Sequence, residues 1–345
     1  MSLASEIHEQ PAVLERLLRE QAAAAREIAR SIRRHEVHWV LIAARGSSDN
    51  AALYAKYLWG WHNRLPVAMA APSLFTLYGT PPRLRGALVV GISQSGQSPD
   101  IVSVVEEGRR QGAPTLAITN EPASPLAGAA ELVFDTATGP ERAIAATKTY
   151  TAQLLAVAML ATALSDDEKA SAELDRAPEL VGAALALDST IAEAAAGYRE
   201  MTRCVVVGRG FNYATAYEWS LKLEELSYVV AEPYSSADFR HGPLAMAGPG
   251  FPVLAVVPGG AVHDDVMALL SVLVAERGVD LVAISDRPEA LALARTPLPL
   301  PADLPEWLSP LAAIVPGQLF SYHLARAMGL DTEAPRGLTK VTQTW

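Results

Sequence analysis

The chain contains an internal repeat, and this repeat restricts its possible folds more than any other feature of the sequence. Residues 40–46 (VLIAARG) match residues 204–210 (CVVVGRG), and residues 86–96 (GALVVGISQSG) match residues 250–260 (GFPVLAVVPGG) at the same spacing. Residues 112–120 match 278–286, and residues 152–154 match 317–319, with nearly the same offset. Four matches in one order indicate a tandem duplication. A chain of 345 residues is long enough for two domains of ordinary size.

Each half contains short apolar runs that end in Gly or Ser and precede helical stretches. Continuous apolar runs of this length are typical of parallel strands buried on both faces of a sheet. We expect helices at 48–59, 100–111 and 150–164. The expected strands lie at 39–43, 87–92, 115–119 and 131–135 in the first half, and at 204–207, 253–257, 281–285 and near Leu298 in the second. The predicted fold class is α/β, with two tandem doubly wound parallel sheets.

The pattern divides the chain into five segments. A helical arm at 1–34 precedes a first domain at 35–176, and a polar, Ala-rich linker helix at 177–200 leads to a second domain at 201–330. The tail at 331–345 lies outside the repeat. It is compatible with a frayed end, or with a segment that docks and brings Lys340 to a site.

Charge and cysteine content exclude several classes of function. The formal net charge is −10, whereas nucleic-acid binding depends on clustered Lys and Arg, so we expect no nucleic-acid partner. No apolar run is long enough to span a membrane, and the polar N-terminus does not resemble a signal peptide, so no membrane partner is expected. The single cysteine, Cys204, permits no intramolecular disulfide, which is typical of a reducing compartment. We therefore expect a cytoplasmic protein.

Two loops of the first half, each directly after a predicted strand, are rich in hydroxyl side chains. They are Arg45-Gly46-Ser47-Ser48 and Ser93-Gln94-Ser95-Gly96-Gln97-Ser98. Ligands bind at the carboxyl ends of parallel strands, where the N–H groups of a helix N-terminus can hold a phosphate. One Ser at such a place is more often a helix cap, but five in two loops of one sheet favour an anion site. The sequence contains neither GxxxxGK[ST] nor GxGxxG, so the expected ligand is a small phosphorylated molecule.

The second half lacks these hydroxyls, but its first predicted strand is followed by a helix with charges on one face. Glu218, Lys222 and Glu225 are spaced at i, i+4 and i+7, which places them on the same side of a helix. Their spacing fits a catalytic group. It fits equally well a solvated face with a weak ion pair, worth about 0.3–0.5 kcal/mol.

His241 lies in a loop dense in turn-forming residues, within the run SSADFRHGP (235–243). The other histidines lie among charged surface stretches or in a terminal helix. A loop histidine near a carboxylate-bearing helix can form an acid/base pair, because His titrates near neutral pH. A histidine in an exposed surface turn is the alternative with equal weight.

Together these motifs resemble the sugar isomerase (SIS) domain pair that forms the isomerase half of glucosamine-6-phosphate synthase. The resemblance covers about residues 39–345, and it implies that both sheets have the flavodoxin-like order. The variants RGSSD, YAKYL, AATK, SSADF and KVTQT resemble more closely the stand-alone SIS-type glucosamine-6-phosphate deaminases. The similarity is carried, in order, by ARGSSDNAALYAKYL, SQSGQSPD, ERAIAATKTYTAQL, GRGFNYATAYEWSLKLEELSYVVAEPYSSADFRHGP and PRGLTKVTQ.

The resemblance also implies roles for individual residues. The family's base between sugar carbons C1 and C2 corresponds to Glu225, and its ring-opening histidine, which can come from the neighbouring subunit, corresponds to His241. Lys222 corresponds to a helix lysine beside the base, and Lys340 to the carbonyl-facing lysine of the C-terminal loop. The substrate-binding residues implied are Ser47, Ser48, Ser93, Gln94, Ser95, Ser98 and Ala145. The implied partner is a phosphorylated amino sugar, the implied assembly is a homodimer with shared active sites, and no metal or organic cofactor is implied.

Differences from the synthase favour one reaction. The synthase begins with a glutaminase domain whose first residue is a nucleophilic Cys, whereas this chain begins Met1-Ser2 and contains only Cys204. Ala146 replaces the Ser of the synthase's Ser-Thr-Lys sequence, which removes one hydroxyl contact to the sugar. We therefore expect a glucosamine-6-phosphate deaminase that forms fructose 6-phosphate and ammonia. The alternatives are an enzyme for galactosamine 6-phosphate or a fructosamine-type 6-phosphate conjugate, a synthase-like isomerase without deamination, and a non-catalytic sugar-phosphate sensor.

Overall fold

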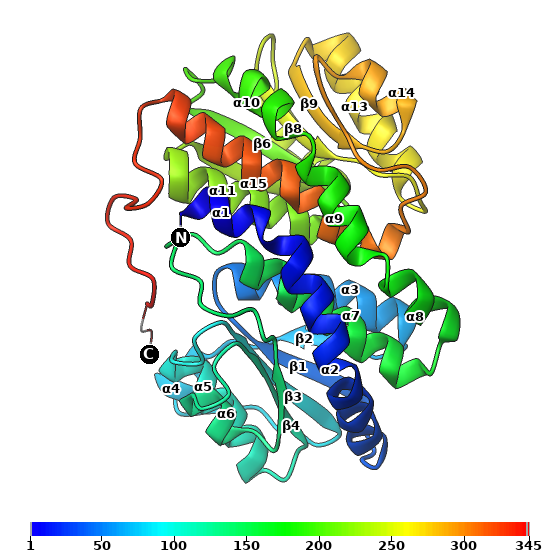
Figure 1. The fold of residues 1–345 in the computed structure, drawn as a ribbon, viewed down its shortest axis with the longest axis vertical. Helices are drawn as coiled ribbons and strands as arrows, with labels where there is room; N and C mark the ends of the chain where they lie inside the picture. Colours follow the sequence, from blue (N-terminus) through cyan, green and yellow to red (C-terminus); the bar gives the residue numbers. More distant parts are fainter. Residues whose placement is uncertain (1, 343, 345) are drawn as a thin grey trace. The chain divides into compact units, whose positions relative to one another are not determined.

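The computed structural model describes residues 2–342 and 344, and it divides into two compact units. Unit 1 comprises Met1–Pro11, Arg142–Thr147 and Ala177–Leu338, and unit 2 comprises Ala12–Glu141, Lys148–Arg176 and Thr339–Trp345. Each unit is built on its own five-stranded parallel sheet within the described residues. The two halves of the repeat therefore form two separate sheets (Figure 1).

The two sheets have the same topology and register. In unit 2 the strand order is β2-β1-β3-β4-β5, and in unit 1, read from its other edge, it is β7-β6-β8-β9-β10. Leu41 of β1 pairs with Val89 of β3, and the repeat-related residues Val205 and Val253 pair in the same way. The predicted tandem doubly wound fold is thus confirmed. The strands are β1 (Trp39–Ala43), β2 (Val67–Met69), β3 (Ala87–Ser93), β4 (Thr115–Thr119), β5 (Leu132–Asp135), β6 (Arg203–Gly208), β7 (Val230–Ser235), β8 (Pro252–Val256), β9 (Asp280–Ser285) and β10 (Thr296–Pro299).

Two strands, β2 and β7, were not expected from the sequence. They occupy the same edge position in the two sheets. β2 has only three residues, and β7 contains Glu232 and Pro233. An edge strand has one unpaired side, so it tolerates Pro and charged residues and lacks the continuous apolar run of a central strand. Neither segment therefore carries the signal that identified the other strands.

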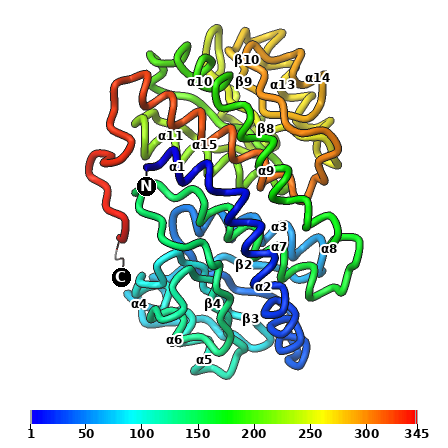
Figure 2. The backbone as a smooth tube through the Cα atoms, in the orientation of Figure 1, coloured from blue at the N-terminus to red at the C-terminus, as the bar shows by residue number. Residues whose placement is uncertain are grey.

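In unit 2, helices cover both faces of the sheet. α3 (Ser47–His62) packs against α7 (Lys148–Ser165), and the indole of Trp59 donates a hydrogen bond to the Val157 carbonyl at 3.1 Å. α5 (Pro99–Arg110), with α4 (Ser73–Thr76) and α6 (Pro125–Ala129), covers the opposite face. α7 is buried on all sides over residues 148–162. α2 (Gln10–Arg33) and α8 (Glu168–Leu174) complete the unit (Figure 2).

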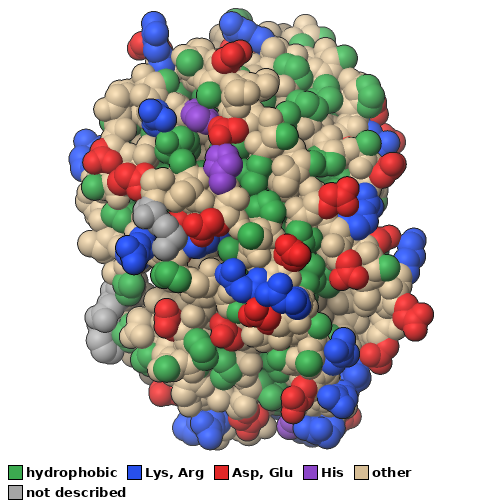
Figure 3. Space-filling view, viewed as in Figure 1, with side chains coloured by type: hydrophobic (Ala, Val, Ile, Leu, Met, Phe, Trp, Pro, Cys, Tyr) green, Lys and Arg blue, Asp and Glu red, His purple; other side chains and the backbone are tan. Residues whose placement is uncertain are grey.

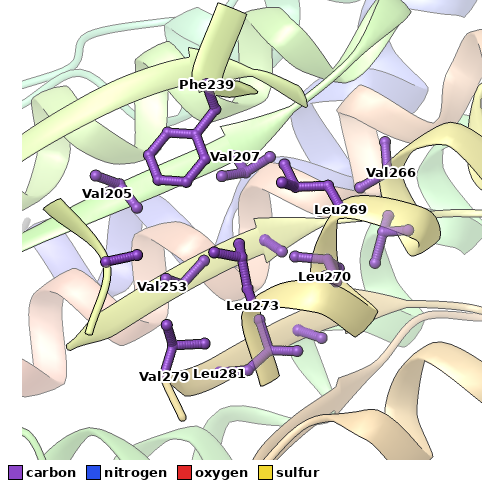
Figure 4. Close-up of a cluster of buried hydrophobic side chains, with 14 of the residues drawn as sticks. Val205, Val207, Phe239, Val253, Val266, Leu269, Leu270, Leu273, Val279 and Leu281 are labelled. Carbon is purple, nitrogen blue, oxygen red and sulfur yellow. The ribbon is translucent and has the colours of Figure 1, made fainter. Parts of the chain in front are cut away.

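Unit 1 is arranged in the same way. α11 (Tyr213–Ser227) and α15 (Ser309–Ala327) pack against each other, and α1 (Leu3–His8) contacts α15. The other face carries α12 (Ser236–Arg240), α13 (His263–Arg277) and α14 (Pro288–Leu293). The side chain of Phe239 is fully buried among residues of β6, β8 and α13, which anchors α12 in the core (Figure 4).

The range 177–200, where the sequence predicts one linker helix, contains two helices. α9 (Ala177–Leu185) and α10 (Asp188–Ala196) both contact α15 and belong to unit 1. The apolar residues Leu180, Val181 and Ile191 are buried in this packing, so the segment is part of a core rather than a solvated linker.

Among the residues that the structure describes, no helix is long and apolar enough to cross a membrane. On the face that Figure 3 shows, acidic and basic side chains are interspersed. This face does not present the continuous basic surface that a nucleic-acid backbone requires.

Candidate functional site

The two hydroxyl-rich loops lie side by side at the topological switch point of unit 2. β1 and β3 are neighbours in the sheet, and the chain leaves β1 toward one face, through α3, and leaves β3 toward the other, through α5. In an open α/β sheet of this order, ligands bind at that point, outside the carboxyl ends of the strands. The structure therefore brings Ser47 and Ser48 close to the loop that contains Ser93, Gln94, Ser95 and Ser98.

The hydrogen bonds of these loops favour ligand binding over helix capping. Ser98 is the N-cap residue of α5, yet its side chain makes no capping hydrogen bond, and α3 begins after Gly46, which has no side chain to cap it. Ser93 Oγ accepts a hydrogen bond from the Gly96 N–H at 3.1 Å and so shapes the loop from within. Ser48 accepts one from the Gln153 amide at 3.0 Å, which ties α3 to α7. The N-cap residues of α3 and α5 thus provide no side-chain cap. In the first turn of α5, however, the Ile101 N–H donates to Asp100 Oδ1 at 2.9 Å and the Asp100 N–H donates to the Thr344 carbonyl at 3.3 Å.

An arginine and a glycine hold the two loops in place. The guanidinium of Arg45 contacts the fully buried carboxylate of Asp100 at 2.8 and 2.9 Å, which links the loop after β1 to the first turn of α5. Gly96 has a φ of +61°, and a Cβ atom there would lie 2.1 Å from Ser124 Oγ. Only glycine fits that position without strain. Arg45 also places a positive charge beside the hydroxyls, although the sequence motifs assign it no role.

Lys340, from the C-terminal tail, is bound to a buried carboxylate of unit 2. Its Nζ lies 2.6 Å from Glu141 Oε2, and the side chain of Glu141 is fully buried. Glu141 also accepts hydrogen bonds from the Thr149 N–H at 3.1 Å and the Thr149 hydroxyl at 2.8 Å, in the first turn of α7. The tail therefore docks on unit 2, which agrees with one of the two alternatives from the sequence. Glu141 begins the motif ERAIAATKTYTAQL, but the sequence assigned it no role.

In unit 1, the three charges on α11 form one buried cluster. Lys222 Nζ lies 3.5 Å from Glu218 Oε1, and neither side chain is exposed to solvent. Lys222 also donates a hydrogen bond to Glu225, whose side chain is 22% exposed. The solvated-face alternative is therefore wrong. Glu225 alone of the three reaches solvent, so it is the carboxylate that a small molecule could approach.

His241 is held by its neighbours rather than by the core. It follows α12, which is anchored by Phe239, and its own side chain is exposed. Arg240 donates hydrogen bonds to the carboxylate and the backbone carbonyl of Asp265 at 2.8 and 2.7 Å. Hydrogen bonds from Ser236 and from Arg240, together with the nearby charge of Arg209, lower the pKa of Asp265 below its ordinary value. This network fixes the base of the histidine loop to α13.

Ala145 lies in the short segment of the first half that packs as part of unit 1. The whole residue, backbone included, is buried. The described residues contain no group of three or more His, Cys, Asp or Glu side chains arranged to hold a metal ion.

The sequence matches a known family in both halves. The model of the SIS domain matches residues 35–163 and again residues 198–327, which together form most of the chain. The chain belongs to the SIS domain family. The first SIS domain carries the hydroxyl loops, and the second carries α11 and the histidine loop.

Individual SIS proteins resemble this chain along nearly its whole length. It is 36% identical to the protein named glutamine–fructose-6-phosphate aminotransferase (isomerizing) from Thermococcus kodakarensis, over 97% of this chain and 56% of that protein. The chain thus spans little more than half the length of that relative. A crystal structure described as that of a candidate phosphosugar isomerase from Silicibacter pomeroyi is 32% identical, with a TM-score of 0.85, and covers 96% of this chain and 100% of its own. A glucosamine-6-phosphate deaminase from Thermotoga maritima shares the fold, with a TM-score of 0.79 at 21% identity over the whole of both chains.

Proposed function

We propose that this SIS protein converts glucosamine 6-phosphate to fructose 6-phosphate and ammonia. The observation that carries the proposal is the buried cluster on α11, in which Lys222 binds Glu225 and leaves that carboxylate accessible. A carboxylate held in this way can move a proton between adjacent carbon atoms, which is the central step of an aldose–ketose isomerisation. Further support comes from the relatives, whose names describe chemistry on sugar phosphates.

The phosphate group would bind at the switch point of the first SIS domain. Ser47, Ser93, Ser95 and Ser98 offer hydroxyls there, beside the N-termini of α3 and α5, whose N-cap residues make no side-chain cap. N–H groups and the positive end of a helix dipole stabilise a bound anion. Because the open-chain form of a sugar is flexible, binding its phosphate restricts the reacting carbons to fewer positions. Gln94 and Ser48 complete the proposed site.

The second SIS domain would carry the proton transfers. His241 opens the pyranose ring by moving a proton between O1 and O5. Glu225 then removes the proton from C2 of the open-chain amino aldose and returns a proton to C1. A second proton passes from the amino nitrogen to O1, which leaves a hydroxyl at C1 and an imine at C2. Water adds to this imine, the C–N bond breaks, and ammonia leaves as the C2 carbonyl of fructose 6-phosphate forms. The ammonium groups of Lys222 and Lys340 stabilise the negative charge that develops on O1 during the transfer. None of these steps requires a metal or an organic cofactor.

The proposed arrangement assigns one task to each part of the chain. The first domain binds the phosphate, the second performs the proton transfers, and the tail closes the site with Lys340. His241 is exposed, so it is available to a neighbouring subunit. We propose a homodimer with shared active sites, which light scattering tests directly.

The decisive experiment measures ammonia release from glucosamine 6-phosphate by the purified protein. We expect turnover by the wild type and a loss of at least a hundredfold in Glu225→Gln. The adjacent Glu224→Gln is a matched control. Burial and the nearby charge of Glu232 raise the pKa of Glu224, whereas the ion pairs of Lys222 described above are with Glu218 and Glu225. Binding of the sugar phosphate without ammonia release would contradict the deaminase. Full activity in Glu225→Gln would exclude Glu225 as the base.

A second experiment separates deamination from isomerisation alone. The names of the relatives also allow an alternative, an isomerase that interconverts glucose 6-phosphate and fructose 6-phosphate, a reaction in which no nitrogen is released. In D₂O, transfer through Glu225 incorporates deuterium at C1 of the product in either case. Deuterium incorporation without ammonia would assign the isomerase, and no incorporation would favour a sensor that only binds the sugar phosphate.

A further inference from the structure

The segment Arg142–Thr147 packs with unit 1, although the residues on both sides of it belong to unit 2. It is part of an irregular stretch, residues 136–147, between β5 and α7. A stretch of this length without helix or strand is unusual in a compact domain and is commonly a functional loop. Glu141, which binds Lys340, directly precedes the segment, and Ala145 lies within it.

Glu6 of α1 holds the beginning of this segment. Its carboxylate accepts hydrogen bonds from the backbone N–H of Arg142 at 2.6 Å and of Ala143 at 3.1 Å. The Glu6 side chain is fully buried, and Ala143 is 3% exposed. A buried carboxylate is tolerated only when hydrogen bonds or charges compensate its lost hydration, so this contact has a strict geometry.

Two amides hold the end of the segment. The buried side chain of Gln10 donates to Gln318 Oε1 at 2.9 Å, and Gln318 Nε2 lies 3.5 Å from the carbonyl of Thr147. Gln318 is on α15, which packs against α11, the helix that carries Lys222 and Glu225. The N-terminal helix, the segment 142–147 and the catalytic helix are therefore connected within unit 1.

We propose that Glu6 is a positioning residue that fixes the backbone of Arg142–Thr147 for contact with the sugar end of the substrate. The proposal rests on the function proposed above. Arg142 is exposed and Ile144 and Ala146 are half-buried, so these residues of the segment can reach a ligand, and Glu6 binds the backbone at the start of the segment. Glu6 itself touches no substrate. The hydroxyl loops that bind the phosphate belong to unit 2 and do not depend on it.

The variant Glu6→Gln tests the proposal. Glutamine has the same shape, but its amide presents one oxygen and one N–H₂ group, so one of the two backbone N–H groups loses its acceptor. We expect KM for glucosamine 6-phosphate to rise about tenfold, with a smaller change in kcat. Inhibition by inorganic phosphate, which reports on the hydroxyl loops alone, should keep its wild-type inhibition constant. In hydrogen exchange, the Arg142 and Ala143 amides should lose protection.

The control is Glu15→Gln, the same substitution at an exposed position of α2. It should leave KM, kcat and phosphate inhibition at wild-type values. Equal KM values in Glu6→Gln and the wild type, or a parallel loss of phosphate inhibition, would overturn the positioning role. If Glu6→Gln does not fold, the variant Gln318→Met tests the other end of the segment. It should give the same rise in KM with unchanged inhibition by phosphate. An unchanged KM in Gln318→Met would also overturn the proposal. A wild type that neither binds nor converts the sugar phosphate would instead refute the proposed function.

Discussion

The buried cluster on α11 makes a quantitative prediction, because unit 2 contains a solvent-exposed pair with similar spacing. Lys222 and Glu218 are i,i+4 neighbours 3.5 Å apart with no exposed side-chain surface. Lys169 and Glu173 on α8 are also i,i+4 neighbours, 3.8 Å apart, but the Lys169 side chain is 87% exposed. Replacing each lysine by methionine keeps most of the aliphatic stem and removes the charge. The two variants therefore differ mainly in the environment of the carboxylate left behind.

The expected losses of stability differ by about tenfold. Lys222→Met leaves the buried Glu218 carboxylate without the ammonium group, and breaking a buried ion pair from one side costs about 3–5 kcal/mol. Lys169→Met breaks an exposed helical pair, which costs about 0.3–0.5 kcal/mol. Combining Lys222→Met with Glu218→Gln removes the buried charge as well, so most of the loss should be recovered.

Urea unfolding at neutral pH, followed by circular dichroism, measures these differences. Hydrogen exchange of peptides from α11 localises them to unit 1. The loss in Lys222→Met should shrink at acidic pH, because a buried carboxylate without its cation is less costly once protonated. A Lys222→Met variant no less stable than Lys169→Met would refute the reasoning, as would a double variant as unstable as the single one.

Three further predictions concern the elements around the site. Asp265→Asn should destabilise the protein by about 1 kcal/mol at neutral pH, a modest value because the carboxylate is partly exposed. Since the pKa of Asp265 is lowered in the folded state, its contribution is complete above the ordinary value of about 3.9 and is lost as the pH falls below it. The urea midpoints of the variant and the wild type should therefore approach each other as the pH falls below that value. Gly96→Ala should lower the free energy of unfolding by about 2–4 kcal/mol and raise the KM for the sugar phosphate, because the φ of Gly96 is positive and the new Cβ would meet Ser124. The control is Gly128→Ala, which has nothing within 4 Å of the new Cβ and should leave thermal unfolding unchanged. Lys340→Met should lower kcat at least tenfold. It should lower the free energy of unfolding by only about 1–2 kcal/mol, since Glu141 keeps both hydrogen bonds from Thr149. A loss of activity explained entirely by the loss of folded protein in thermal unfolding would contradict a catalytic task for the tail.

The sequence predicts the central strands, the duplication and the hydroxyl loops because each is encoded by neighbouring residues. β1 and β3 are continuous apolar runs, and they remain so in the second copy as β6 and β8. Two edge strands escape prediction for the same reason in both copies. Their stability depends on pairing with a neighbour rather than on their own composition.

Contacts between distant residues could not be predicted in this way. Glu141 binds Lys340, and Glu6 binds the backbone of Arg142, across more than a hundred residues of sequence. A lone glutamate has no local pattern that distinguishes a buried acceptor from a solvated charge. The spacing of Glu218, Lys222 and Glu225 predicts that they share a helix face, but the burial of that face depends on α15 packing against it.

The second copy of the switch point explains why only one SIS domain is expected to bind the phosphate. The loop after β8 occupies the place of the loop after β3, but its N–H groups already have anionic partners. The N–H of Gly259 donates to the carboxylate of Asp286 at 2.6 Å, and the N–H of Ala261 donates to that of Glu306 at 2.8 Å. The first copy has no acidic side chain on the corresponding N–H of Gln97, which instead faces the hydroxyl of Ser95 at 3.4 Å.

The backbone of this loop has thus kept its capacity to bind an anion in both copies, because strand order and register are the same. In the second copy the protein supplies the anion from its own side chains, and the conformation is held without a ligand. In the first copy the Gln97 N–H faces the neutral hydroxyl of Ser95 instead of a carboxylate, so this is the loop that we propose to receive the anion of a bound phosphate. The proposed division of tasks between the two domains follows from this difference.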